Sequence, residues 1–217
     1  MSALKTTLNS PVFFWLLLAV PSIPLTLGLT QGSMAYGELM HVSGEFSARF
    51  MIVALMVTPL MVMFPNRHWP RWLMARRRYL GVAAFGYAAL HTIAYLLETG
   101  TVSRIAGDLA KAGIWTGWVA FVVFVPLALT SNDASVRTMG PAWKTLQRAV
   151  YAAAVFTLLH WIFIHNTLGG ALVHFAPLAA LEAYRVWVRG IPGLFRSPAS
   201  SSRSRPSRDT RQDVLQD

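Results

Sequence analysis

The sequence predicts an all-α integral membrane protein, a single bundle of six transmembrane helices. Hydrophobic residues make up 54% of the 217 residues and charged residues only 13%, whereas soluble domains carry about 25% charged residues. The hydrophobic residues occur in runs near 20 residues long, about the length that an α-helix needs to cross a bilayer. The chain has no cysteine, which excludes disulfides, iron–sulfur clusters and thiolate metal sites.

Six stretches of the chain are long and hydrophobic enough to be membrane spans. They cover residues 11–30, 46–64, 79–98, 114–130, 148–165 and 171–188. The first stretch lacks a small-residue cleavage motif, which favours a retained helix over a signal peptide. Pro21 and Pro24 are expected to kink it, and Thr58-Pro59 is expected to break the second stretch near its end.

Polar loops are predicted between the spans, and the chain has no length left for a second folded domain. The loops cover residues 31–44, 66–78, 99–113, 131–147 and 166–170. Residues 1–190 are therefore predicted to form one membrane domain. Residues 191–217 have the composition of a disordered segment, and we expect a basic cytoplasmic tail there.

The basic residues predict the orientation of the bundle. With six spans, 16 of the 19 lysines and arginines fall on one side, and the other side holds Arg49, Arg104 and Lys111. Because loops rich in lysine and arginine stay in the cytoplasm, both termini are predicted to be cytoplasmic. The net charge of +10 then reflects contact with anionic membrane lipids, not nucleic acid. The cluster Arg76 to Arg78 is interpreted mainly as part of this signal, with binding of a quinone, a flavin or a partner protein as the alternative.

His91 and His160 lie inside two predicted spans that run in the same direction. His91 follows Arg78 by 13 residues and His160 follows Arg148 by 12, so both lie about 18 Å of helix from the basic end. An ionisable side chain within a bilayer is costly and indicates a functional site. A single such histidine is most simply a polar contact to a neighbouring helix. Two at one depth also suit a haem iron held between helices, and depth alone leaves both interpretations open.

The other candidate residues lie nearer the helix ends. His174, in the sixth span, is the second choice for an iron ligand. Arg49, in the second span, is suited either to neutralise a haem propionate or to anchor the helix at lipid headgroups.

The remaining three histidines are not expected to take part. His41 and His68 fall in predicted loops, where solvated side chains are the simplest interpretation. His165 follows His160 by five residues, about 140° around a helix, and is not expected to share its face.

Three blocks of sequence resemble a known family of bacterial membrane proteins. The first is ARRRYLGVAAFGYAALHTIAY, which ends at Tyr95 and fits the pattern RR-x-LG-x-x-AF-x-Y-x-x-LH. The others are RFMIVALMVTPL at 49–60 and PLALTSNDASVRTMGPAWKTLQRAVY at 126–151. Together they are similar to the haem-binding subunits of the protein-methionine-sulfoxide reductase system, within the ferric-reductase-like transmembrane family.

The resemblance implies a six-helix protein of the inner membrane that binds haem b and passes electrons across the membrane. In that family the electrons come from the quinone pool or a cytoplasmic flavin reductase, so FMN or quinone is a possible further cofactor. They go to a periplasmic molybdopterin reductase subunit that repairs methionine sulfoxide, so no catalytic residue is expected in this chain itself. The resemblance maps the axial haem ligands onto His91 and His160.

One departure from the family pattern concerns the start of the fifth span. The family normally reads LHR there, and its histidine is a further haem-ligand candidate. This chain reads Leu146-Gln147-Arg148. Glutamine is a poor haem ligand, so the sequence predicts one haem, in the outer half of the bilayer, with recruitment of another ligand for a second haem as the alternative.

Two other classes of protein are the alternatives to a haem protein. A transporter would need a polar site at mid-membrane and usually paired repeats, but none of the first five predicted spans has an acidic residue in its middle. An assembly or scaffold protein would not require two histidines at one depth.

Overall fold

The computed structural model describes residues 10–165 and 167–190, and every regular element in them is helical. The all-α prediction is therefore confirmed, while the predicted tail, residues 191–217, lies outside the described residues. The helices are α2 (Pro11–Ala19), α3 (Ser22–Thr30), α4 (Tyr36–Met63), α5 (His68–Thr99), α6 (Val102–Asp108), α7 (Ala112–Leu129), α8 (Asp133–Met139), α9 (Pro141–Gln147), α10 (Val150–His165) and α11 (Leu168–Gly190).

Four stretches of the described chain are long and apolar enough to cross a membrane. They are α4, α5, α7 and the stretch Pro141–His165, and the bent pair of α2 and α3 would make a fifth. The sixth predicted span, residues 171–188, is helical within α11 but does not reach the same apolar character, because Glu182 and Arg185 interrupt it. The protein is thus a multi-pass membrane bundle.

The long helices extend well beyond the predicted spans. α4 has 28 residues and α5 has 32, which correspond to about 42 and 48 Å of helix, against an apolar bilayer core of about 30 Å. The predicted loops 31–44 and 66–78 are therefore largely helical, which corrects the sequence-based boundaries. Hydrophobicity marks the part of a helix that lies in lipid, whereas the helix itself continues into polar sequence.

The prolines act differently at the two predicted breaks. The chain bends by 46° between α2 and α3, where Pro21 has no N–H to continue the hydrogen-bond ladder. Pro59 is fully buried inside α4, and the helix continues to Met63. The predicted break at Thr58-Pro59 is wrong, because a proline in a membrane helix is tolerated where neighbouring helices pack around it.

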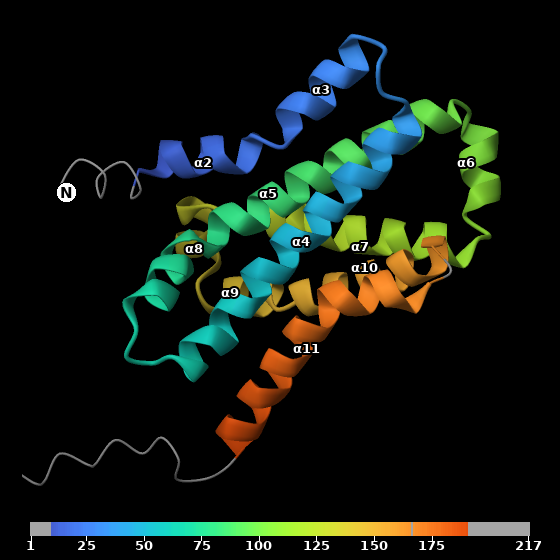
Figure 1. Cartoon of the computed structure of the whole chain (residues 1–217). Coiled ribbons are helices and arrows are strands. Elements are labelled where there is room, and N and C mark those ends of the chain that lie inside the picture. The colour runs from blue at the N-terminus through green and yellow to red at the C-terminus, as the bar shows by residue number, and fades with distance from the viewer. Residues whose placement is uncertain (1–9, 166, 191–217) are drawn as a thin grey trace, which may run out of the picture.

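Two helix pairs make up the centre of the bundle. α4 packs along α5, and α10 packs along α7 (Figure 1). Small side chains allow close approach between membrane helices, and Ala84 of α5 and Ala153 of α10 are completely buried in the shared core. The Ser47 hydroxyl of α4 also donates a hydrogen bond to the carbonyl of Ala84, at 2.9 Å.

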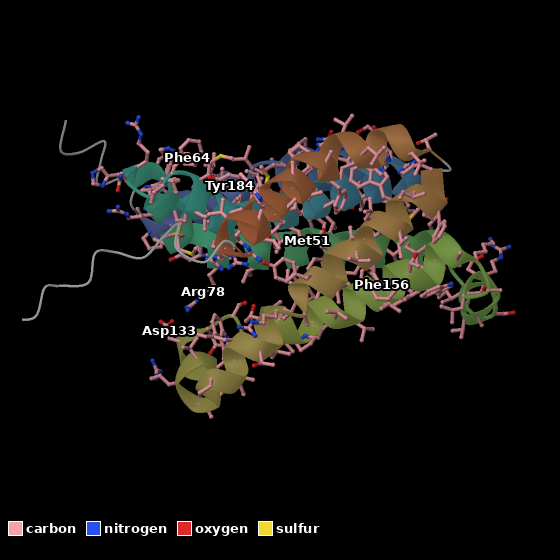
Figure 2. The ribbon with its side chains drawn as sticks, turned by 90° about the horizontal axis from the view of Figure 1, so that it is seen from below. Met51, Phe64, Arg78, Asp133, Phe156 and Tyr184 are labelled. Carbon is pink, nitrogen blue, oxygen red and sulfur yellow. The ribbon has the colours of Figure 1, made fainter. Side chains whose placement is uncertain are left out.

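The ends of the bundle carry different short helices. Figure 1 shows α6 at one end, and α8 and α9 at the other. Figure 2 shows Met51 in the middle of the bundle, while Arg78 and Asp133 face each other at the end near α8. Arg78 Nη1 donates to Asp133 Oδ1 at 2.5 Å and holds the pKa of that carboxyl below its usual range. This ion pair joins the start of α5 to α8.

Removing the hydroxyl of Tyr87 should weaken the packing of α2 against α5. Tyr87 is buried in α5 and donates a hydrogen bond of 3.1 Å to the carbonyl of Leu18 in α2. Tyr87→Phe leaves that carbonyl without this donor, so we expect a loss of unfolding free energy on the order of 1 kcal/mol. The thermal midpoint of the detergent-solubilised protein measures it. Tyr79→Phe, which keeps the ring contacts with Phe14 and Trp15, is the control, and an equal loss there would contradict the prediction.

Candidate functional site

An apolar cavity of about 450 Å³ lies between the two central helix pairs. Its walls come from the first half of α4, the second half of α5, residues 114–124 of α7 and the second half of α10, so it lies toward the α6 end of the bundle. Apolar side chains dominate the walls, and His91 and His160 both line it. Cavities of about 300–1,000 Å³ are the usual size for small-molecule and cofactor sites.

His91 of α5 is held by the backbone of α4. Its Nδ1 lies 2.8 Å from the carbonyl oxygen of Met40. A carbonyl oxygen only accepts hydrogen bonds, so Nδ1 carries the proton and donates. In the neutral ring Nε2 then has a free lone pair, the form in which imidazole binds a metal.

His160 of α10 is held by α7 in the same way. Its Nδ1 lies 2.5 Å from the carbonyl oxygen of Gly113, so this ring also donates through Nδ1 and presents an unprotonated Nε2. The two histidines therefore reach one cavity from opposite helix pairs and in the same tautomer.

The spacing of the two rings suits one metal ion between them. Their centroids are 5.9 Å apart and the ring planes are at 89°. With metal–nitrogen bonds of about 2 Å, two imidazoles on opposite sides of one metal would have centroids roughly 6 Å apart. Among the described residues no group of three or more His, Cys, Asp or Glu side chains is placed to hold a metal ion. The pair thus fits a metal whose remaining ligands come from a macrocycle, since an iron in such a ring needs only axial ligands.

His41 and His165 also lie at this cavity, at its α6 end. Both line it, and their ring centroids are 5.4 Å apart. His41 belongs to α4, so its assignment to a loop is wrong. His165 lines the same cavity as His160, although the five-residue spacing places it on another face of α10. The cavity is wide enough to contact more than one face of α10. The helical spacing of Gly37, His41 and Gly44 was the signal that could have placed His41 on α4.

Arg49 and His174 lie outside the cavity, against each other. Arg49 Nε donates to His174 Nε2 at 3.3 Å, and Arg49 Nη2 pairs with Glu45 Oε2 at 2.6 Å. His174 Nδ1 donates to the carbonyl of Gly170 at 2.8 Å. Both nitrogens of His174 are therefore engaged, and neither residue is among those that line the cavity.

Gln147 lies at a second, much smaller cavity toward the α8 and α9 end. This cavity has a volume of about 50 Å³. The Gln147 side-chain amide donates to the carbonyl of Leu127 and to Thr130 Oγ1, both at 3.1 Å. These bonds tie the end of α9 to the end of α7, and the space left between them is far below the usual size of a cofactor site.

The three consecutive arginines of α5 all contact other parts of the protein. The Arg76 guanidinium lies 4.0 Å from the centroid of the Trp72 ring. Arg77 Nη1 donates to Thr58 Oγ1 at 3.4 Å, and Arg78 pairs with Asp133. Their contacts join α5 to α4 and α8, so they take part in packing at this end of the bundle.

Comparison with known proteins agrees with this architecture. Residues 43–159 match the family described as Ferric reductase like transmembrane component. A protein-methionine-sulfoxide reductase heme-binding subunit from Azospira oryzae is 33% identical over 195 residues, covering 86% of this chain and 79% of the relative. Relatives of the same description from Polaromonas naphthalenivorans (35% identical, 81% of this chain and 78% of the relative) and Agrobacterium fabrum (34%, 67% of each) also match. No solved structure matches the chain.

Proposed function

The chain belongs to the ferric reductase-like transmembrane family, and on that premise we propose that it binds haem b and carries electrons across the bacterial inner membrane. One observation carries the proposal. Two histidines from different helix pairs line one apolar cavity, each with Nδ1 bonded to a backbone carbonyl and Nε2 left for a metal. The relatives, whose names describe heme-binding subunits, support the same conclusion.

The residues of the cavity fit a haem. His91 and His160 would be its two axial ligands, and their ring separation of 5.9 Å matches two imidazoles on one metal. A bound haem supplies a one-electron carrier. With both histidines on the iron, no axial position is open to a substrate, which suits electron transfer. Apolar side chains such as Phe124 and Trp118 line the cavity and offer contact to a flat apolar ring.

The Arg49 guanidinium already pairs with Glu45. To neutralise a haem propionate, Arg49 would have to give up this ion pair. We therefore propose an anchoring role for Arg49 in place of a propionate contact. His174 is likewise proposed as a partner of Arg49 and not as an iron ligand, because its Nε2 accepts the Arg49 hydrogen bond.

We propose that electrons enter from the quinone pool or from a cytoplasmic flavin reductase, with quinone or FMN as the second cofactor. They would leave to a periplasmic molybdopterin reductase subunit. The relatives' description as part of a methionine-sulfoxide reductase supports a reductase partner. The chain would then be the electron-transfer subunit, and the reduction of substrate would take place on the partner.

We also propose that α11 is the sixth span, which leaves both termini in the cytoplasm. Its 23 residues measure about 34 Å, enough to cross the apolar core. Its two interior charges are paired, because Arg185 Nη2 lies 2.8 Å from Glu182 Oε2 and Arg185 Nη1 donates to the Tyr151 hydroxyl at 3.0 Å. Pairing lowers the cost of holding charges in a membrane helix.

Loss of either axial histidine should remove the low-spin haem. In His91→Ala or His160→Ala the iron would lose one axial bond, so we expect loss of the sharp reduced α-band or of the haem itself. Reduced-minus-oxidised spectra and the haem-to-protein ratio of the purified variants measure this. His174→Ala is the matched control and should keep the wild-type spectrum. Full low-spin haem in His160→Ala would assign its role elsewhere, and a wild-type protein without a Soret band would favour a transporter or an assembly protein.

The haem count should be one. The cavity beside Gln147 holds about 50 Å³, so Gln147→His alone should not create a second haem site, although it restores the family's residue. We expect a haem-to-protein ratio near one for the wild type and for this variant. A ratio near two in either protein would show that the inner end of the bundle opens to admit a second macrocycle.

A reporter fused after Asp217 should lie in the cytoplasm. Sixteen of the 19 basic residues are on that side in the six-span arrangement. A C-terminal fluorescent protein should therefore be bright and a C-terminal alkaline phosphatase inactive. The same fusions after Lys111 should give the opposite pair of results, and an active phosphatase at the C-terminus would exclude six spans.

A further inference from the structure

We propose that Gly44 and Gly117 position the two cavity histidines by leaving a backbone carbonyl of the neighbouring helix uncovered. The proposal rests on the proposed function insofar as it assigns these rings to a haem. The contacts on which the positioning role is based are between protein atoms.

The first contact is between α4 and α5. A Cβ atom added to Gly44 would lie 2.9 Å from Nδ1 and 3.2 Å from Cε1 of His91. Carbon atoms of side chains do not approach other atoms this closely, so the imidazole occupies the space that any other residue at position 44 would fill. The same Nδ1 donates to the carbonyl of Met40, which lies four residues before Gly44.

The second contact, between α7 and α10, repeats this arrangement. A Cβ atom added to Gly117 would lie 2.7 Å from Nδ1 and 2.8 Å from Cε1 of His160. His160 Nδ1 donates to the carbonyl of Gly113, again four residues before the glycine. In both places the glycine follows a small hydroxyl residue, Ser43 or Thr116, and the imidazole lies between the glycine and the carbonyl four residues before it.

The four-residue spacing has a physical cause. In an α-helix the carbonyl of residue i−4 accepts the N–H of residue i, and its oxygen keeps a second lone pair. The side chain of residue i points back toward the N-terminus and covers the surface over that preceding turn. A glycine at i removes the cover, so an imidazole from another helix can lie against the backbone and bond to the carbonyl.

At the other glycines of the described chain, an added Cβ atom would not meet a histidine ring. Gly81 and Gly86, on the same helix as His91, have no atom within 4 Å of an added Cβ atom. Gly28 is crowded, with Met34 Cβ at 3.0 Å, but Met34 does not line the cavity. Among the described glycines, Gly44 and Gly117 are the two whose added Cβ atom would meet an imidazole ring.

The consequence concerns the metal-binding nitrogen. A hydrogen bond from Nδ1–H to a carbonyl fixes the tautomer and the ring orientation and makes Nε2 more basic. A more basic ligand stabilises ferric iron relative to ferrous iron. The two glycines would thus keep the reduction potential of the haem low, and they act through the histidines as positioning residues.

The test substitutes alanine at each position in the full-length protein and measures the midpoint potential and the electron paramagnetic resonance of the ferric haem. Gly44→Ala and Gly117→Ala should displace the ring from its carbonyl, shift the potential to more positive values and change the g values. Gly86→Ala controls for the loss of a helical glycine, and Gly28→Ala controls for crowding away from the cavity. Both controls should keep the wild-type potential and spectrum. Wild-type values in both Gly44→Ala and Gly117→Ala would overturn the proposal.

A second measurement needs neither haem nor a glycine variant. In wild-type protein labelled with ¹⁵N-histidine and produced without haem, nuclear magnetic resonance should find a protonated Nδ1 and an unprotonated Nε2 on His91 and His160. His174 is expected to show the same tautomer, so the resonances of the two cavity histidines are assigned by their loss in His91→Ala and His160→Ala. If those two rings instead carry the proton on Nε2, the positioning role is wrong even where haem binds. If the tautomers are as expected but the wild type binds no haem, the proposed function fails and the positioning role stands.

Discussion

Two backbone carbonyls, those of Met40 and Gly113, make it possible for polar rings to lie inside an apolar bundle. A buried polar group without a partner is costly, and in a bilayer water cannot supply one. Each carbonyl accepts the Nδ1–H of a histidine from the neighbouring helix. Because this bond satisfies Nδ1, the other ring nitrogen, Nε2, remains unprotonated. The interaction that satisfies the ring therefore also prepares it as a ligand.

The two ends of the bundle differ in what they can hold. Toward α6 the helices separate around a cavity of about 450 Å³, whereas near α8 and α9 a cavity of only about 50 Å³ lies beside Gln147. The amide of Gln147 bridges to α7 through two hydrogen bonds and so closes this end by direct contact. The proposal of a single haem follows from this asymmetry.

Several charged side chains of the described helices are paired with polar or charged partners. Arg49 contacts Glu45 and His174, Arg185 contacts Glu182 and Tyr151, and Arg78 contacts Asp133. At the α6 end, Lys111 donates to Asp108 at 2.7 Å, which lowers the pKa of that carboxyl. Such pairs contribute little stability where water screens them, but within a membrane helix they reduce the cost of burying a charge.

The sequence by itself determined the helical class, the membrane location and the two central histidines. These follow from local facts: runs of apolar residues near the bilayer thickness, and His91 and His160 at one distance from basic helix ends. It did not predict that His41 and His165 line the same cavity, or that Pro59 continues a helix. Only the tertiary structure decided those points, and it alone paired each ring with a carbonyl beside a glycine. Which atoms meet across two helices depends on how the helices are rotated and how closely they pack, and no pattern along one helix specifies that.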